Sequence, residues 1–249
     1  MDLNGDIGEH FSSQPSHEDE SLLGALTSAN IACGFHAGDP LTMHNTVLRC
    51  RSAGVRVGAH PSYPDLAGFG RRYLQMARGE LSAAVIYQIS ALAGISQASG
   101  AKLGYVKAHG ALYNRVFGDD GEAETFVEAV ADFDDSLVIL GQPDSALDNA
   151  CRKRGIRFVR EGFADRRYDR HGALLPRSDP RALIGSLEEQ VSQALAFAHG
   201  TMIEAIDGIN IHLEVDSICV HGDSRDAGAA ALAIRCALTA DGIPVAPFC

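Results

Sequence analysis

The sequence lacks both a surplus of basic residues and the long apolar runs that mark membrane proteins. Acidic residues outnumber basic ones by 32 to 21, and the formal net charge is −11. Nucleic-acid binding requires clustered lysine and arginine, so this balance argues against a nucleic-acid partner. No run approaches the roughly 18 apolar residues that span a bilayer, and no basic amphipathic segment suits an anionic membrane. We therefore expect no nucleic acid and no membrane as partners.

Closely spaced cysteine pairs are also absent. The six cysteines are scattered, and no two form a C-x-x-C pair. A chain of 249 residues can bury a sizeable core without cross-links, so the cysteines indicate reduced, mostly buried thiols. The first residues show no basic segment followed by an apolar core, which a signal peptide would have. These features predict a cytoplasmic protein.

Short catalytic signatures are missing as well. The sequence contains no G-x-x-x-x-G-K-[ST] phosphate loop, no G-x-G-x-x-G after a strand and no G-x-S-x-G elbow. It has no H-E-x-x-H motif that would place two imidazoles on one helical face. A ligand site would therefore have to be assembled from separate segments.

What the chain does contain is a repeated order of helix, glycine and strand. At Gly54, Gly100, Gly155 and Gly242 a helical pattern ends on glycine and a short apolar run follows. Glycine just past a helix adopts the left-handed conformation that closes the last turn. The predicted strands are residues 2–7, 29–34, 55–59, 103–107, 137–141, 156–161 and 216–220, with 243–246 as a possible eighth.

Alternating strands and helices imply a parallel sheet, either closed into a β/α barrel or open and doubly wound. An open sheet binds its ligand with only a few strand ends, whereas polar residues follow nearly every predicted strand here. We therefore predict one β/α-barrel domain over residues 1–249, with a long loop at residues 165–180. Asp39 and Pro40 are expected to begin a helix as its cap and first residue.

Polar residues gather where the predicted strands end. Lys107 and Glu161 lie on otherwise apolar strands, where a buried charge needs a partner. Lys107 and His109 share one side of their strand, because side chains repeat every second residue. A barrel would bring these groups to one mouth, where crowding shifts pKa values. The candidates are Asn4, Asp6, Glu9, Asn30, His36, Asp39, His60, Asp65, Lys107, His109, Asn114, Glu161, Asp165, Arg166, His221 and Asp223.

Several candidates have more than one interpretation. Asp39 and Asp223 equally suit the role of helix caps. Arg71 and Arg72 are either solvated or bind a carboxylate through two parallel hydrogen bonds. A divalent metal such as Zn or Mn could be bound by Asp6, His60 and His109, although nothing in the sequence fixes their spacing.

Six motifs carry a resemblance to a known family. In order from Asp2 to Asp223, DLNGDIGE, SANIACGFHAGDP, GAHPSYPDLAGFGRR, KAHGALYN, EGFADRRY and CVHGD resemble the LamB/YcsF family, whose members are described as the A subunit of ATP-dependent 5-oxoprolinase. Two positions depart from the family pattern: Gly5, where cysteine is usual, and Ala108, where proline is usual.

The resemblance implies a β/α barrel related to polysaccharide deacetylases, with seven strands rather than eight. It also implies that 5-oxo-L-proline, water and ATP (with Mg) give L-glutamate, ADP and phosphate, together with two partner subunits. The residues assigned to catalysis are Asp6, Glu9, Lys107, His109 and Glu161. Asp6 or Glu161 would be the general base, and Lys107 with His109 would stabilise charge on oxygen. The residues assigned to substrate binding are Asn30, His36, His60, Arg71, Arg72, Asn114, Arg166, His221 and Asp223, with an arginine on the substrate carboxylate.

Two other functions remain open at this point. The chain could be a metal-dependent amidase or deacetylase of N-acyl sugars, which would act without ATP. It could also be a non-catalytic subunit that presents 5-oxoproline or another small lactam to catalytic partners.

Overall fold

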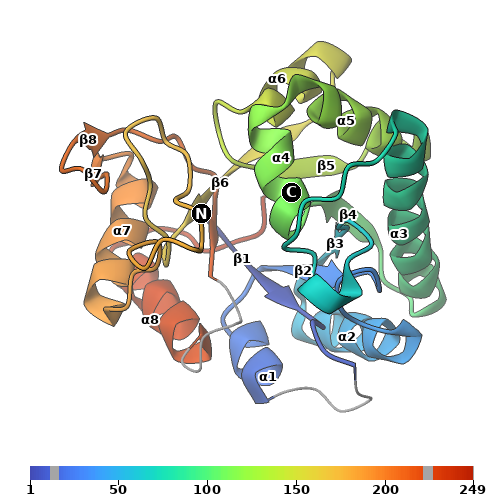
Figure 1. The fold of residues 1–249 in the computed structure, drawn as a ribbon. Coiled ribbons are helices and arrows are strands. Elements are labelled where there is room, and N and C mark those ends of the chain that lie inside the picture. The colour runs from blue at the N-terminus through green and yellow to red at the C-terminus, as the bar shows by residue number, and fades with distance from the viewer. Residues whose placement is uncertain (12–16, 221–226, 249) are drawn as a thin grey trace.

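The computed structural model describes residues 1–11, 17–220 and 227–248, and it shows a closed barrel of parallel strands (Figure 1). The strands pair in the order β1-β2-β3-β4-β5-β6-β9, and β1 closes the ring by pairing with both β2 and β9. The predicted seven-stranded β/α barrel is confirmed. The strands are β1 Asp2–Ile7, β2 Ser28–Ala32, β3 Arg56–His60, β4 Leu103–Val106, β5 Val138–Gly141, β6 Phe158–Phe163 and β9 Ser217–Cys219.

Helices alternate with the strands and lie outside the barrel (Figure 1). Asp39 caps α2 as predicted: its side chain accepts a hydrogen bond from the Thr42 backbone at 2.8 Å, and Pro40 begins the helix. Gly54 and Gly155 end α2 and α6 in the left-handed conformation. The helices are α1 His17–Leu23, α2 Pro40–Ala53, α3 Arg78–Ala98, α4 Gly110–Gly118, α5 Asp120–Asp134, α6 Ala146–Arg154, α7 Leu187–His199 and α8 Ala227–Ala240, with a short 3₁₀ helix η1 Leu66–Gly68.

The segment predicted as a possible eighth strand, residues 243–246, does not join the barrel, and that prediction is wrong. Instead it crosses beside the start of β1, where Ala246 N donates to Met1 O at 3.1 Å and the Met1 amino group donates to Pro244 O at 2.7 Å. Proline has no N–H to contribute to a strand ladder, and Pro244 lies within this stretch while Pro247 follows it.

The barrel interior is polar because β1, with the sequence DLNGDI, turns its alternate polar residues inward. Asn30 donates hydrogen bonds of 2.8 Å to Asn4 Oδ1 and to Asp6 Oδ1. Asn4 in turn donates to Ser217 Oγ at 2.8 Å, and Ser217 donates to the buried carboxylate of Asp2. A continuous hydrogen-bonded network therefore runs along the interior and ends at Asp6.

Tyr105 fills part of this interior and depends on a glycine opposite. A Cβ atom added to Gly58 would lie 2.1 Å from Tyr105 Cζ, so no larger residue fits without moving the ring. The Tyr105 hydroxyl donates to Asn30 Oδ1 at 2.7 Å. This bond orients the Asn30 amide so that its NH₂ group faces Asn4 and Asp6.

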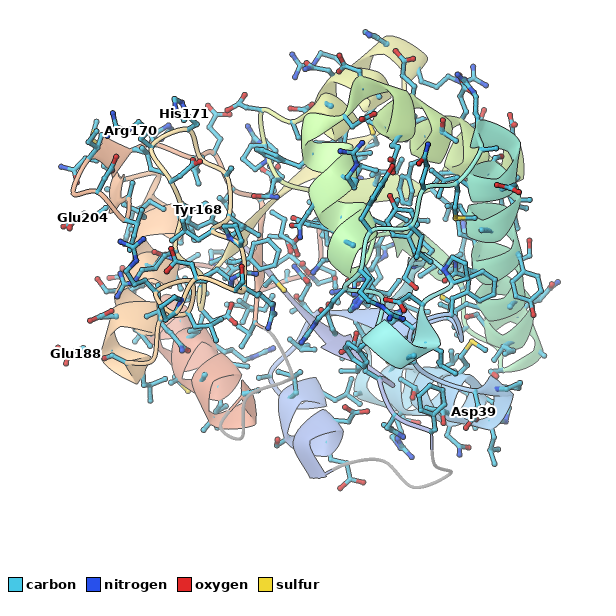
Figure 2. All side chains as sticks on the ribbon, viewed as in Figure 1. Asp39, Tyr168, Arg170, His171, Glu188 and Glu204 are labelled. Atoms are coloured by element: carbon cyan, nitrogen blue, oxygen red, sulfur yellow. The ribbon has the colours of Figure 1, made fainter. Side chains whose placement is uncertain are left out.

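The long loop between β6 and α7 contains residues 165–180, as predicted. Isolated bridges pair Arg166 with Leu183 and Tyr168 with Leu174 within it. The sequence did not predict the small hairpin of β7 (Ile203–Glu204) and β8 (Asn210–Ile211). Figure 2 shows Arg170 and His171 of the loop on the same side of the molecule as Glu204, away from Asp39.

Among the described helices, α3 is long and apolar enough to cross a membrane by length and composition alone. Its buried residues Leu81, Val85, Ile89 and Leu92 repeat at helical spacing and belong to the hydrophobic core. Packing in the outer layer of the barrel therefore accounts for the apolar face of this helix.

Two glycine-to-alanine changes should have opposite effects on stability. Gly58→Ala should lower the free energy of unfolding by about 1–3 kcal/mol, because the new methyl group overlaps the Tyr105 ring. Gly94→Ala, in the exposed interior of α3 with no atom within 4 Å of the added Cβ, should raise it by about 0.5–1 kcal/mol. Urea denaturation of both variants tests the expectation, and equal effects would contradict it.

Candidate functional site

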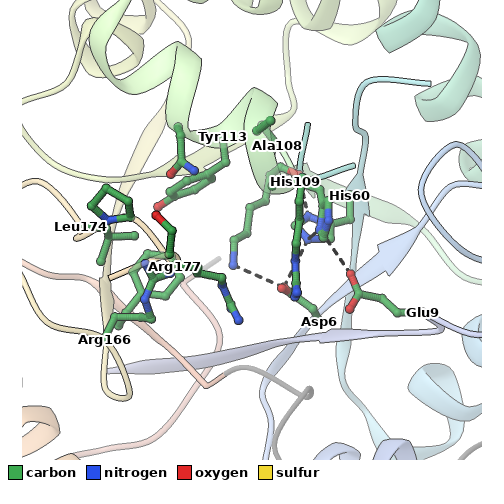
Figure 3. A pocket seen from close by; sticks show the side chains of 17 residues that line it. Asp6, Glu9, His60, Ala108, His109, Tyr113, Arg166, Leu174 and Arg177 are labelled. Carbon is green, nitrogen blue, oxygen red and sulfur yellow. Dashed lines mark hydrogen bonds and ion pairs between the residues drawn. The ribbon is translucent and has the colours of Figure 1, made fainter. Parts of the chain in front are cut away.

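A cavity of about 340 Å³ lies at the carboxyl ends of the strands, above the polar interior network (Figure 3). Strand ends and the loops that follow them supply its walls, which is where β/α barrels place their sites. The lining residues are Asp6, Glu9, His60, Arg71, Lys107, Ala108, His109, Gly110, Ala111, Tyr113, Asn114, Phe163, Arg166, Leu174, Pro176, Arg177 and Ser178.

Eight of the fourteen residues assigned to catalysis or substrate binding line this cavity. Asn30, His36 and Glu161 are fully buried and support the lining from behind rather than forming it. His221 and Asp223 lie outside the described residues. The predicted residues that line the cavity are Asp6, Glu9, His60, Arg71, Lys107, His109, Asn114 and Arg166.

The structure corrects the expectation for Arg72, which does not line the cavity. Its Nε donates to Asp65 Oδ1 at 2.9 Å, and its backbone N–H donates to the other oxygen of the same carboxylate at 3.2 Å. Arg72 therefore holds the loop after β3 in place.

Two imidazoles meet at the centre of the cavity wall. His60 Nδ1 contacts the Lys107 carbonyl oxygen at 2.8 Å, and His109 Nε2 contacts the Phe69 carbonyl oxygen at 2.9 Å. Carbonyl oxygens only accept hydrogen bonds, so both of these nitrogens carry hydrogen. The remaining nitrogens, His60 Nε2 and His109 Nδ1, lie 3.0 Å apart and present two lone pairs to each other when both rings are neutral. Such a pair requires a proton or a cation.

Two carboxylates complete this cluster. Asp6 Oδ1 lies 3.4 Å from His60 Nε2, and Glu9 Oε1 lies 3.2 Å from His109 Nδ1. One ligand atom from each of the four residues falls within 4.8 Å of every other. Nitrogen and oxygen donors in this number suit a divalent ion, and imidazoles that bind metals commonly donate their second N–H to a carbonyl, as both do here. Glu9 was not part of the metal set predicted from the sequence.

His36 supports the cluster from the buried side. Its ring stacks on that of His109 with centroids 3.7 Å apart, and its Nε2 lies 3.1 Å from Glu9 Oε1. Burial lowers the pKa of His36 to about 4, so the ring is neutral at neutral pH. Burial alone would raise the pKa of Glu9, but its interactions with His109 and His36 outweigh burial and hold that pKa well below its usual range. Glu9 is therefore ionised.

Two glycines allow the chain to close around His109. Gly70 and Gly110 both have positive φ, and a Cβ on Gly110 would lie 2.5 Å from Gly70 O. A Cβ on Gly70 would lie 2.8 Å from the His109 ring. The motif KAHGALYN therefore needs its glycine for the close approach of the two loops.

Lys107 joins the cluster to the interior network. Its ammonium lies 2.8 Å from Glu161 Oε1, in a geometry that makes an ion pair rather than a well-formed hydrogen bond, and 3.4 Å from Asp6 Oδ1. Burial opposes the charge, but Asp6 and Glu161 raise the pKa of Lys107 well above its usual value. The Tyr113 hydroxyl donates to Glu161 Oε2 at 2.7 Å. Lys107 is therefore a fixed positive charge beside the cavity.

Sequence reasoning missed Tyr113 and the loop residues Leu174, Pro176, Arg177 and Ser178. Tyr113 lies in the first turn of α4, which His109 precedes as its cap, so the start of this helix could have indicated that both lie at the same strand end. The loop residues follow no helical period, and only the folded loop brings them to the cavity.

The fold and the site define a class, that of seven-stranded β/α barrels with a histidine and carboxylate cluster at the carboxyl ends of the strands. The catalytic domain of a peptidoglycan N-acetylglucosamine deacetylase from Eubacterium rectale shares the fold, with a TM-score of 0.52. That comparison covers 99% of this chain and 87% of the other, at 13% identity, so the likeness concerns the fold alone.

The chain belongs to the LamB/YcsF family, whose sequence model matches residues 1–249. It is 46% identical over 245 residues to the 5-oxoprolinase A subunit of Bordetella pertussis, covering 98% of this chain and 97% of that protein. The crystal structure of a lactam utilization protein from Thermus thermophilus superposes with a TM-score of 0.93 at 38% identity, covering 100% of this chain and 99% of the other. The resemblance found in the six motifs is confirmed.

The ion pair of Lys107 with Glu161 should be visible in stability. Lys107→Met leaves Asp6 and Glu161 buried without their cation and should lower the free energy of unfolding by about 3–5 kcal/mol. Adding Glu161→Gln removes one of the two carboxylates left without a cation. The double variant should therefore lose less free energy of unfolding than the sum of the two single losses. The coupling energy from urea unfolding should be about 0.5–3 kcal/mol, and strictly additive losses would contradict the pairing.

Proposed function

We propose that the chain is the A subunit of an ATP-dependent 5-oxoprolinase, which opens 5-oxo-L-proline to L-glutamate. The main support is the cavity, where carboxylates, imidazoles and an ammonium meet in a small space, in a chain 46% identical to a 5-oxoprolinase A subunit. Because that relative is named as one subunit of an enzyme, partner subunits are proposed for this chain too. A cytoplasmic location and Mg-ATP as co-substrate are parts of the same proposal.

The chemical task is to break a resonance-stabilised amide bond in an unstrained ring. In the proposed reaction Asp6 takes a proton from the water that attacks the lactam carbonyl carbon, and returns it to the ring nitrogen as the C–N bond breaks. Asp6 lines the cavity, whereas Glu161 is fully buried and held by Lys107 and Tyr113. We therefore give the base role to Asp6 and a positioning role to Glu161.

Lys107 is suited to stabilise the negative charge that develops on the lactam oxygen. It lines the cavity, and neighbouring carboxylates keep it protonated. A fixed charge in a site shielded from water stabilises such an oxyanion without reorganising in the transition state. On a route coupled to ATP, the γ-phosphoryl group passes to the same oxygen and ADP leaves, which weakens the amide resonance. Water attack and C–N cleavage then give an acyl phosphate, and a second water molecule hydrolyses it to the carboxylate and phosphate.

Asp6, Glu9, His60 and His109 fit a divalent ion such as Zn²⁺ or Mn²⁺, because two facing nitrogen lone pairs and two carboxylate oxygens converge there. When bound, such an ion would polarise the carbonyl and lower the pKa of a water molecule. Asp6 can serve both as ligand and as base because a carboxylate has two oxygens.

The nucleotide is proposed to bind outside this cavity. The cavity volume of about 340 Å³ is at the low end of the range for small-molecule sites, which is about 300–1,000 Å³. A five-membered lactam fits such a space, but a lactam together with a nucleoside triphosphate does not. Since the sequence also lacks a phosphate loop, we place ATP at the rim or on the partner subunits.

The same histidine and carboxylate cluster also favours a second candidate, a metal-dependent amidase or deacetylase of N-acyl sugars. That enzyme would act without ATP and without partner subunits. A non-catalytic lactam-binding subunit would bind 5-oxoproline but show no effect of a base substitution.

Metal binding provides one test. Calorimetric titration of chelator-treated protein with Zn²⁺ should show about one site, and His60→Ala should weaken it by at least about tenfold because one of four ligands is lost. His44→Ala is the control, since that ring contacts Ser99 away from the cavity. Undiminished Zn²⁺ affinity in His60→Ala would rule the cluster out as the metal site.

Catalysis provides a second test of the proposed function. With the partner subunits added one at a time, glutamate release should require ATP, and Asp6→Asn should lower kcat by about 10²–10⁴-fold because the base is lost. Asn30 still finds an acceptor oxygen in that variant, so the fold should be kept. Asp39→Asn, at the cap of α2, is the matched control and should retain activity. Turnover without ATP would favour the amidase, and full activity of Asp6→Asn would favour the binding subunit.

A further inference from the structure

Arg166 is a buried cation with few partners in the described part of the chain. It is 6% exposed and lines the cavity. Its Nη2 donates to the Leu175 carbonyl oxygen at 2.5 Å, while its Nε is buried without a hydrogen-bond partner. No carboxylate among the described residues forms an ion pair with it. Because a guanidinium cannot lose its charge, this arrangement is costly unless a ligand supplies the counter-charge.

The backbone around Arg166 is fixed before any ligand arrives. Gln193 of α7 donates from its side-chain amide to Arg166 O at 2.8 Å and to Phe163 O at 2.7 Å. Arg166 is also bridged to Leu183 across the loop. Preorganisation of this kind lowers the entropy that binding has to overcome.

The cavity has two ends of opposite charge. Figure 3 shows Arg166 and Arg177 on the other side of the cavity from Glu9 and His60. Burial and then the charge of Arg177 lower the pKa of Arg166, and both effects outweigh the attraction of Asp165. An anionic group is repelled by Asp6 and Glu9 and attracted to the arginine end.

We propose that Arg166 binds the carboxylate of the substrate and makes the site selective for carboxylated lactams over neutral ones. This rests on the proposed function and adds an orientation: the ring amide faces Asp6 and the carboxylate faces Arg166. A guanidinium carries five N–H donors, so those of the cavity-lining Arg166 that do not bond to Leu175 are available to a ligand carboxylate. Arg166 is therefore the specificity-determining residue of the cavity.

The test is calorimetry of the full chain with 5-oxo-L-proline, neutral 2-pyrrolidinone, cyclopentanecarboxylate and inorganic phosphate. The wild-type protein should bind 5-oxo-L-proline about 10- to 100-fold more tightly than 2-pyrrolidinone. Arg166→Met should abolish this preference without weakening 2-pyrrolidinone, and Arg166→Lys should restore part of it. Arg167→Met is the matched control, because that neighbouring side chain pairs with Glu189. Thermal unfolding should show Arg166→Met to be no less stable than the wild-type protein.

Three results would overturn the inference: an unchanged preference in Arg166→Met, equal weakening of both lactams, or Arg166-dependent binding of phosphate but not of carboxylates. The design also separates this inference from the proposed function. Arg166-dependent binding of cyclopentanecarboxylate, with no binding of either lactam, would support the anion site and reject the lactam substrate. If Arg166→Met bound and turned over 5-oxo-L-proline as well as the wild-type protein, the lactam substrate would be supported and the anion site at Arg166 rejected.

Discussion

An ammonium group buried between carboxylates is the interaction on which the rest of the site depends. The Lys107 ammonium lies 2.8 Å from Glu161 behind the cavity and 3.4 Å from Asp6 at its wall, so one cation is shared by two carboxylates inside the barrel. Asn30, oriented by Tyr105, holds the same oxygen of Asp6 from below. The position of the Asp6 carboxylate is thus set by residues from several strands, each of which is paired before a ligand binds.

The sequence allowed much of the barrel to be predicted, because short apolar runs closed by glycine have a strong local cause. The spacing of Lys107 and His109 also placed both at the mouth correctly, since it follows from the strand period alone. Prediction failed where the sequence pattern suited more than one structure or more than one partner. The run at 243–246 resembles a strand, but its prolines exclude it from the ladder. Arg72 was expected in the cavity, but it pairs with Asp65 instead.

Other features of the site leave no recognisable pattern in the amino-acid sequence. The facing lone pairs of His60 and His109 follow from two carbonyl oxygens that only the folded loops supply. Arg177 reaches the cavity from an irregular loop, so neither helical nor strand periodicity could indicate it. The ionised state of Glu9 likewise depends on His36 and His109, which come from different segments. These are the parts of the chemistry for which three-dimensional structure was needed.

The β6–α7 loop has a consequence for how such sites diversify. The histidine and carboxylate cluster lies on strands and their immediate ends, whereas Arg166 belongs to the β6–α7 loop, which α7 anchors through Gln193. The two halves of the pocket can therefore change independently over evolution. A different loop on the same barrel would change the arginine end of the cavity while leaving the histidine and carboxylate cluster in place.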